Sequence, residues 1–330
     1  MADFRALKGL YIKATSSDPS NLIEGDIWYN TTTRTIKVAP LIGTWAAGEN
    51  ATTVRHAVGS AGTQTAGLIF AGTAPGGLQN ATEEYDGTDW TNSGNYGGSA
   101  YSLASFGIQT AAIGAGGHPG LETEAYEYNG STWSAIADVN TGVISGSGAG
   151  TTAAGIKFGG AGAGSFTDVK NESEEYNGTS WAEGNNLNTA RGYITGFGTQ
   201  TATLGAGGYT SPPFVKHTNV ESYDGTSWTA STVLPVGRMQ GSASGIQTAA
   251  FLYGGSTTAP TATAADGQTW DGSAWTTSPA SLVTGRRGMG GSPAGTSVSA
   301  LASVGTAAPG DVASTEEFTS VATARTMDTT

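Results

Sequence analysis

A pair of aromatic positions flanking a short polar segment recurs along most of the chain. In one copy, Tyr223–Trp228, a Tyr is followed by Asp-Gly-Thr-Ser and then by Trp. The other copies are Tyr85–Trp90, Tyr128–Trp133, Tyr176–Trp181 and Trp270–Trp275. A recurrence at roughly 45 residues is typical of proteins built from structural repeats. The pattern therefore predicts a repeat architecture.

The polar segment of each copy predicts a tight turn. Asp-Gly or Asn-Gly between extended segments is a strong hairpin signal, because a type I′ turn needs positive φ at both central residues. A short strand ending in the first aromatic precedes the turn, and a strand carrying Trp follows it. Each copy thus predicts a β-hairpin with a large ring on each arm. Rings at matching places predict an apolar interior shared between repeats.

Four extended pieces make up one repeat. In the fourth repeat they are Arg191–Phe197, Gln200–Gly208, Asn219–Tyr223 and Thr226–Ser231. A strand ending in Gly-Gly, then a loop, then aromatic-turn-Trp resembles the kelch motif over about residues 41–325. The resemblance implies four-stranded blades of a β-propeller. The chain departs from the usual pattern in its very small inner-strand residues and in lacking Arg at the start of the second and third repeats.

The two ends of the repeat region complement each other. Phe318 lies in register with the first aromatics, but no turn and Trp follow it, whereas Trp45 has no partner arm before it. We expect Gly43–Ala47 to supply the outer strand of the last blade, because an open ring would leave unpaired strand edges. The sequence therefore predicts an all-β fold with a six-bladed kelch-like propeller at 41–330, closed by an N-terminal strand.

Residues 1–40 lie outside the repeats and predict a separate hairpin. Ile27 and Tyr29 alternate on one arm, Ile36 and Val38 on the other, with the turn between them. A lone hairpin is marginally stable in water, so we expect this one to pack on a neighbour. The stretch 18–33 resembles the N-terminal segment of tailed-phage fibre and other virion structural proteins. This resemblance implies a virion-attachment or oligomerisation segment at 1–40. We expect its docking residues to be Ile27, Trp28, Tyr29, Ile36 and Val38.

Composition narrows the classes of function. The chain has 330 residues, 52 of them Gly, a net charge of -12 and no Cys. Thiolate metal sites, Cys nucleophiles and the Cys-dependent copper-radical oxidases built on kelch scaffolds are thereby excluded. An acidic chain with scattered Lys and Arg is a poor match for nucleic acid. No apolar run is long enough for a transmembrane helix, and the N-terminus lacks a signal-peptide core.

Charged residues recur with the repeat. Carboxylates precede the first aromatics at 83–84, 122 and 124, 174–175, 221 and 316–317. A glycosidase would need such a pair in a cleft, but their recurrence favours solvent-facing positions on exposed strands. Arg55, Arg191, Arg238 and Arg286 open first strands and could ring an anion, or hydrogen-bond loops to blades, which we favour. The three His residues are scattered, and their spacing predicts no metal site.

The loops after the second strands vary most and are the candidate binding face. Variable loops on a rigid scaffold commonly carry function. Their candidate contact residues are Phe166, Lys170, Tyr209, Phe214, Lys216 and His217. Exposed aromatics there would suit sugar rings or a protein partner, or would fill the gap between neighbouring subunits.

These patterns and resemblances together predict a non-enzymatic phage virion structural protein. We expect a tail fibre or tail-associated role, with the propeller facing outward toward a host-surface glycan, a receptor or a protein. Capsid or tail decoration and a bacterial kelch-type interaction module are the alternatives, and a glycan-active enzyme is a further one. The expected partners are other virion proteins and further copies of the chain, in a virion assembled in the host cytoplasm. No cofactor is expected.

Overall fold

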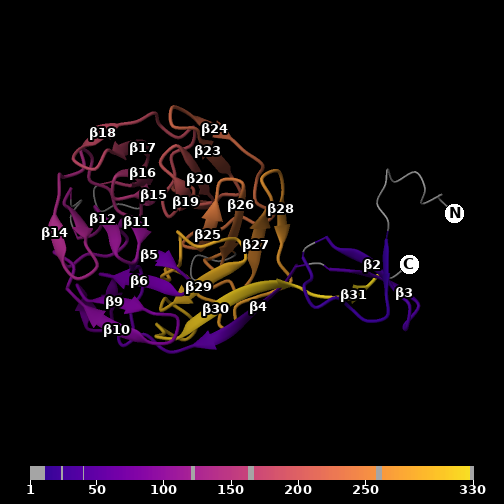
Figure 1. Ribbon diagram of the computed structural model, residues 1–330. Helices are drawn as coiled ribbons and strands as arrows, with labels where there is room; N and C mark the ends of the chain where they lie inside the picture. The colour runs from indigo at the N-terminus through magenta and orange to yellow at the C-terminus, as the bar shows by residue number, and fades with distance from the viewer. Residues whose placement is uncertain are drawn as a thin grey trace. The chain divides into compact units, whose positions relative to one another are not determined.

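The computed structural model describes residues 12–23, 25–39, 41–119, 123–162, 167–257 and 262–327. Every regular element in these ranges is a β-strand, so the prediction of an all-β protein is confirmed (Figure 1). The contacts divide the chain into two compact units. The first contains Met1–Thr44 and Thr319–Thr330, and the second contains Trp45–Phe318.

The second unit consists of small antiparallel sheets that follow one another in sequence. The first sheet contains β5 (Gly59–Thr63), β6 (Ala66–Phe70), β9 (Thr82–Tyr85) and β10 (Trp90–Ser93). The second contains β11 (Ala104–Ile108), β12 (Ala111–Ala115), β13 (Ala125–Tyr128) and β14 (Trp133–Ala135). The third contains β15 (Ser147–Thr151), β16 (Ala154–Ala161), β17 (Val169–Tyr176) and β18 (Trp181–Glu183).

The remaining sheets repeat this order of strands. The fourth contains β19 (Thr195–Thr199), β20 (Ala202–Ala206), β23 (Val220–Tyr223) and β24 (Trp228–Ala230). The fifth contains β25 (Ser242–Ile246), β26 (Ala249–Tyr253), β27 (Gly267–Trp270) and β28 (Trp275–Thr277). The sixth contains β29 (Ser299–Ser303), β30 (Thr315–Ala322) and β4 (Leu41–Gly48). Two short hairpins, β7–β8 (Thr73–Ala74, Gly77–Leu78) and β21–β22 (Tyr209–Thr210, Val215–Lys216), lie in loops.

These sheets surround a common centre, and the fold of this unit is propeller-like (Figure 1). Apolar clusters join the facing sides of consecutive sheets, as the recurring rings predicted. One cluster combines Phe197 and Leu204 of the fourth sheet with Leu252, Trp270 and Trp275 of the fifth. The core is therefore divided into layers between sheets, each filled by apolar side chains from both neighbours.

The sixth sheet takes one strand from the far end of the sequence. Its strand order is β29-β30-β4, so a segment near residue 45 is paired beside the C-terminal strand β30. The Trp45 ring lies 5.3 Å from that of Phe318, 5.2 Å from that of Tyr253 and 6.0 Å from that of Phe251. The spare Trp arm thus occupies the position that Trp occupies in the other sheets.

The recurring turns differ in detail from the predicted type I′ form. Tyr85 pairs directly with Trp90, so the loop contains four residues rather than two. Within it only Gly87 has positive φ, at 91°. The Asp86 carboxylate accepts hydrogen bonds from the backbone N–H groups of Thr88 and Asp89, each at 2.8 Å. The Asp or Asn therefore acts by capping the loop with its side chain, which removes the need for a second positive φ.

The first unit contains a small sheet in the order β1-β2-β3-β31. Its strands are β1 (Lys13–Thr15), β2 (Ile27–Asn30), β3 (Thr35–Val38) and β31 (Arg325–Thr326). The predicted hairpin is present, with Ile27 paired to Val38 and Tyr29 to Ile36. The C-terminal strand β31 completes the sheet, which the sequence did not reveal. In the described ranges, no helix has the length and apolar character needed to cross a membrane.

Candidate functional site

Four fully buried arginines hold the loops of the second unit. Arg55, Arg191, Arg238 and Arg286 form ion pairs with Glu83, Glu221, Asp266 and Glu316 at 2.9, 2.9, 2.5 and 2.5 Å. Each guanidinium also donates to two carbonyls at the base of the loop that follows the second strand, in the first sheet those of Ala71 and Ala81. Burial lowers the pKa of each guanidinium, and the facing carboxylate opposes that shift. The predicted role in joining loops to blades matches these contacts, and we call each such pair a clamp.

The prediction that the recurring carboxylates face solvent is wrong for Glu83, Glu174, Glu221 and Glu316, which are buried. Glu124 of the second sheet is exposed, as predicted. Each buried carboxylate also accepts a backbone N–H from the preceding connection, for example that of Thr52 on Glu83 at 2.6 Å and that of Asn188 on Glu221 at 2.6 Å. Side chains alternate along the strand as predicted, but its inner face holds a buried cation rather than apolar atoms. A carboxylate is stable there because it is paired and hydrogen-bonded.

The next residue along the strand links neighbouring sheets. The phenol of Tyr85 donates to Glu317 at 2.5 Å, that of Tyr223 donates to Glu175 at 2.5 Å, and that of Tyr128 donates to Glu84. Burial, followed by the hydrogen-bonded carboxylate, raises the pKa of Tyr128 to about 12. The same causes raise the pKa of Tyr85 and Tyr223. The carboxylates before the aromatics are thus engaged in structure on both faces of the strand.

Two closed circles of backbone hydrogen bonds surround the centre of the unit. In the inner circle, one residue of each sheet donates its backbone N–H to the backbone carbonyl of the next residue in the circle. The order is Ala57, Gly288, Gln240, Tyr193, Ser145 and Ser102, and Ser102 donates to Ala57. All of these residues have φ between 51° and 58°. In the outer circle, the backbone N–H groups of residues 72, 117, 160, 208, 255 and 305 each donate to one carbonyl of a neighbouring sheet. The accepting carbonyls are, in the same order, those of residues 100, 143, 191, 238, 286 and 55. The sixth sheet therefore bonds to the first just as the others bond in sequence.

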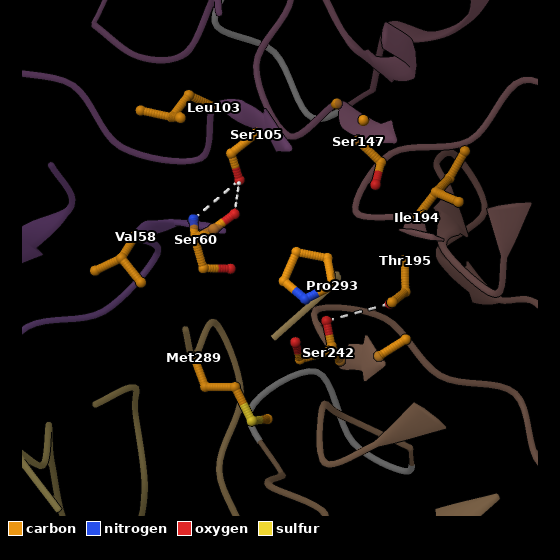
Figure 2. A pocket seen from close by; sticks show the side chains of 15 residues that line it. Val58, Ser60, Leu103, Ser105, Ser147, Ile194, Thr195, Ser242, Met289 and Pro293 are labelled. Atoms are coloured by element: carbon orange, nitrogen blue, oxygen red, sulfur yellow. Dashed lines mark hydrogen bonds between the residues drawn. The ribbon is translucent and has the colours of Figure 1, made fainter. Parts of the chain in front are cut away.

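A cavity of about 110 Å³ lies on the axis of these circles (Figure 2). Its polar lining comes from first-strand hydroxyls, and these residues are Ser60, Ser105, Ser147, Thr195 and Ser242. Ser105 Oγ joins two sheets by accepting the Ser60 N–H at 2.9 Å and donating to the Ser60 carbonyl at 3.0 Å. Pro293 lies among these side chains (Figure 2). Small residues are needed here because all the first strands converge on one axis.

A second cavity of about 100 Å³ is lined by the inner circle itself. It shares Val58, Leu103, Ile194 and Met289 with the first cavity. The inner circle adds Ser102, Ser145, Tyr193 and Gln240 as polar lining. We call this cavity the channel mouth. Sequence reasoning missed it, because its residues share no type and only their common backbone conformation relates them.

The predicted loop residues have different environments. Phe166 lies outside the described residues. Lys170 pairs with Asp168 at 3.0 Å. Lys216 donates to Ser256 Oγ at 2.7 Å. Burial and then Arg191 lower the pKa of His217, which lies 3.0 Å from Thr210 Oγ1.

The two predicted aromatics of the fourth-sheet loop pack on each other. Phe214 is 44% exposed and stacks on Tyr209 at 5.5 Å between ring centroids. The expectation that Tyr209 is exposed is wrong, since its exposure is 1%. Its ring lies between Phe214 and Tyr193, 5.6 Å from the latter, and fills the space left by Gly192. The aromatic surface of this loop is therefore carried by Phe214, with Tyr209 as its support.

The predicted docking residues divide between the two faces of the first unit's sheet. The pairing places Ile27, Tyr29, Ile36 and Val38 on one face, because directly opposed residues share a face. Ile27 is 47% exposed on this side. Trp28 alternates to the other face, where it is buried and its indole N–H donates to Asp18 at 3.1 Å. Trp28 is thus part of the core of this unit, and the other four form what we call the attachment face.

Within the described residues, no group of three or more His, Asp or Glu side chains is placed to hold a metal ion. His56 instead pairs with Asp311 at 2.8 Å. The His118 ring lies tilted beside that of Tyr101, with ring centroids 4.9 Å apart.

Comparison with known proteins gives the fold alone. No family model matches the chain, and no curated protein matches it by sequence. A solved structure described as "Structure of YjhT" is similar with a TM-score of 0.66 at 15% identity, covering 81% of this chain and 95% of that chain. At this identity the likeness extends to architecture and not to residues of a site.

Proposed function

We propose that the chain is a non-enzymatic structural protein of a tailed-phage virion, a tail fibre or tail-associated protein. The first unit docks on the particle, and the second unit faces outward and binds a host-surface molecule or a protein. The resemblance of residues 18–33 to virion attachment segments supports the docking role. The exposed Phe214 in a loop of the second unit supports the binding role.

The second unit is, in this proposal, a six-bladed kelch-like propeller closed by the N-terminal strand β4. The strand order β29-β30-β4 and the circles of hydrogen bonds that join the sixth sheet to the first support this closure. Removing residues 1–48 should strongly lower the melting temperature, because β30 loses its partner and the rings of Tyr253 and Phe318 lose Trp45. An unchanged melting temperature in that variant would contradict closure.

The observation that carries the docking role is the attachment face. Ile27, Tyr29, Ile36 and Val38 form one side of a small sheet, and Met327 follows β31 beside them, since its N–H donates to the Ile36 carbonyl at 3.0 Å. Met327 is 47% exposed. A sheet of a few short strands that leaves such side chains in water gains stability by packing on a partner.

The structural contacts of the buried carboxylates favour a binding role over a catalytic one. A general acid or nucleophile needs a carboxylate free to reach a substrate. The buried Glu83, Glu221 and Glu316 are instead each bound by an arginine and by backbone N–H groups. Their recurrence in several sheets at equivalent places is the behaviour of scaffold residues.

Labelling intact particles with antibodies to the second unit tests the proposal in the electron microscope. Label at the tail supports the tail-associated role, and label on the head moves the protein to capsid decoration. Absence of label on well-stained particles would overturn the virion role and leave a bacterial interaction module.

A matched pair of variants tests the attachment face. Ile27→Lys with Ile36→Lys places charge on this face, whereas Lys13→Glu with Lys37→Glu changes charge on the opposite face. We expect the first variant to be missing from purified particles and the second to be present, with equal melting of the second unit in both. Equal incorporation of the two variants would exclude this face as the docking surface.

A further inference from the structure

We infer that the channel mouth binds the edge of a single sugar ring. The inference rests on the proposed function and deepens it, because it names the chemistry that the outward unit recognises and the place where it does so. Four features of the mouth support it: an unpartnered buried hydroxyl, a polar lining, an aromatic wall and a small volume.

Ser145 supplies the first observation. Its side chain is buried and lines the cavity, yet its hydroxyl has no hydrogen-bond partner in the described structure. A buried hydroxyl without a partner is unfavourable, and such groups call for an explanation. The Ser145 backbone cannot turn away, because its N–H and carbonyl both belong to the inner circle. The side chain therefore stays at the cavity, where its hydroxyl can bond to a group that enters.

The other polar groups of the mouth match hydroxyls in chemistry. Ser102 Oγ and the Tyr193 phenol lie 3.5 Å apart and can each donate or accept. Gln240 offers an amide whose oxygen lies 3.5 Å from the Arg287 guanidinium. These neutral groups can exchange hydrogen bonds with a polyol, whereas a metal ion would need carboxylate or imidazole ligands.

An aromatic wall leads outward from this site. The rings of Tyr193, Tyr209 and Phe214 follow one another with centroids 5.6 and 5.5 Å apart. Tyr193 lines the cavity, and Phe214 at the outer end is 44% exposed. A sugar ring carries C–H groups on its faces and hydroxyls on its rim, so an apolar wall beside hydroxyl partners suits it.

The size of the mouth limits how much of the ligand enters. Its volume of about 100 Å³ is well below the range of roughly 300–1,000 Å³ found for sites that enclose a drug-sized ligand. Val58, Leu103, Ile194 and Met289 add apolar lining, which disfavours the entry of further polar groups. The mouth therefore takes the rim of one ring, such as the terminal unit of a surface polysaccharide, and the affinity for a free monosaccharide is weak.

Saturation-transfer NMR on the full chain tests the inference, with D-glucose, D-galactose and N-acetyl-D-glucosamine as separate probes. Ser145→Ala removes the unpartnered hydroxyl with little effect on folding. Tyr193→Ser and Gln240→Ser put into the inner circle a residue that it already accepts at Ser102 and Ser145. Ser147→Ala is the matched control, since Ser147 lines the first cavity and not the channel mouth.

We expect saturation transfer to at least one probe, a loss of affinity of about tenfold in Ser145→Ala, and no change in Ser147→Ala. Tenfold corresponds to the loss of one good hydrogen bond. Transfer that is equal in the wild type and in all three mouth variants would place any sugar elsewhere and overturn the inference. Absence of transfer to every probe would overturn it as well.

The result is separable from the virion proposal. Label on particles together with absence of sugar binding would remove the mouth as a sugar site and leave the virion role. Sugar binding that the mouth variants abolish, together with absence of label on particles, would support the mouth as a sugar site and remove the virion role.

Discussion

The second and fourth sheets differ at the positions where the fourth holds a loop with a buried arginine and a buried carboxylate. In the fourth, Arg191 pairs with Glu221 at 2.9 Å and donates to the Asn219 carbonyl at 3.0 Å. The bridges Gly192–Tyr209 and Tyr101–His118 align Arg191 with Ala100. Glu221 lies two residues before Tyr223, and the equivalent residue before Tyr128 is Tyr126. Both charges are thus replaced together, and Tyr126 joins Tyr96 and Trp133 in an apolar cluster.

The third sheet shows why both members change at once. Val143 takes the place of Arg, but Glu174 is kept, and Lys157 on the neighbouring strand pairs with it at 3.1 Å. A buried carboxylate without a cation is costly, whereas replacing a whole buried pair by apolar groups is often nearly neutral. The sheets thus need a held loop and not a particular charge. The unfavourable arrangement is a buried charge that has lost its partner.

The largest effect is expected from breaking one clamp. Arg191→Ala leaves Glu221 buried without its cation and frees the Gly207 and Asn219 carbonyls. We expect a loss of about 3–5 kcal/mol in the free energy of unfolding, measured by urea denaturation. Arg325→Ala in the exposed strand β31 is the control and should change little. A loss below about 1 kcal/mol in Arg191→Ala would contradict the role of the clamp.

A slightly smaller loss is expected in the third sheet. Lys157→Met removes the cation from Glu174, which keeps its hydrogen bonds from the Asn140 and Thr141 N–H groups at 2.7 and 2.9 Å. Because these bonds remain, we expect about 3 kcal/mol, the lower end of the range for a broken buried pair. The same urea measurement applies. Stability equal to the wild type would mean that backbone N–H groups alone suffice for the carboxylate.

Copying the second sheet into the fourth sharpens the comparison. The double variant Arg191→Ala with Glu221→Tyr removes both charges. The two freed carbonyls and the Asn188 and Thr189 N–H groups lose their partners, but no buried charge is left unpaired. We expect a loss of about 2 kcal/mol, smaller than that of Arg191→Ala alone. A double-mutant cycle by urea denaturation measures the coupling. A double variant less stable than the single one would show that the aromatic solution depends on its own sheet.

The smallest effect concerns the tyrosine links, which both sheets use. In the folded chain, burial and the Glu84 hydrogen bond raise the pKa of Tyr128 from the ordinary tyrosine value of 10.0 to about 12. The folded state holds this proton more tightly than the unfolded state, so its contribution is complete below pH 10 and lost as pH rises toward about 12. Unfolding free energies measured across this window should fall with pH, and less steeply in Tyr128→Phe. Identical slopes would contradict the link.

Local residues explain how far the proposed binding surfaces could be predicted. The attachment face followed from alternation, since Ile27, Tyr29, Ile36 and Val38 lie at period-two positions on paired arms. The prediction failed for Trp28 because an aromatic in a short hairpin looks exposed until the loop with Asp18 covers it. It failed for Tyr209 because the burial of that ring depends on Tyr193 and Phe214. The channel mouth was missed entirely, because its lining comes from every sheet.

The sequence by itself determined the repeat, the all-β class and the place of the hairpins, because turns and alternation act over a few residues. The recurrence of the arginines and carboxylates with the repeat was also visible in the sequence. Only the tertiary structure decided that these charges are buried partners, that β31 completes the first unit's sheet, and that backbone hydrogen bonds join the last sheet to the first. The physical reason is distance along the chain. Burial and pairing arise where segments far apart in sequence meet, and no local pattern records which segments these are.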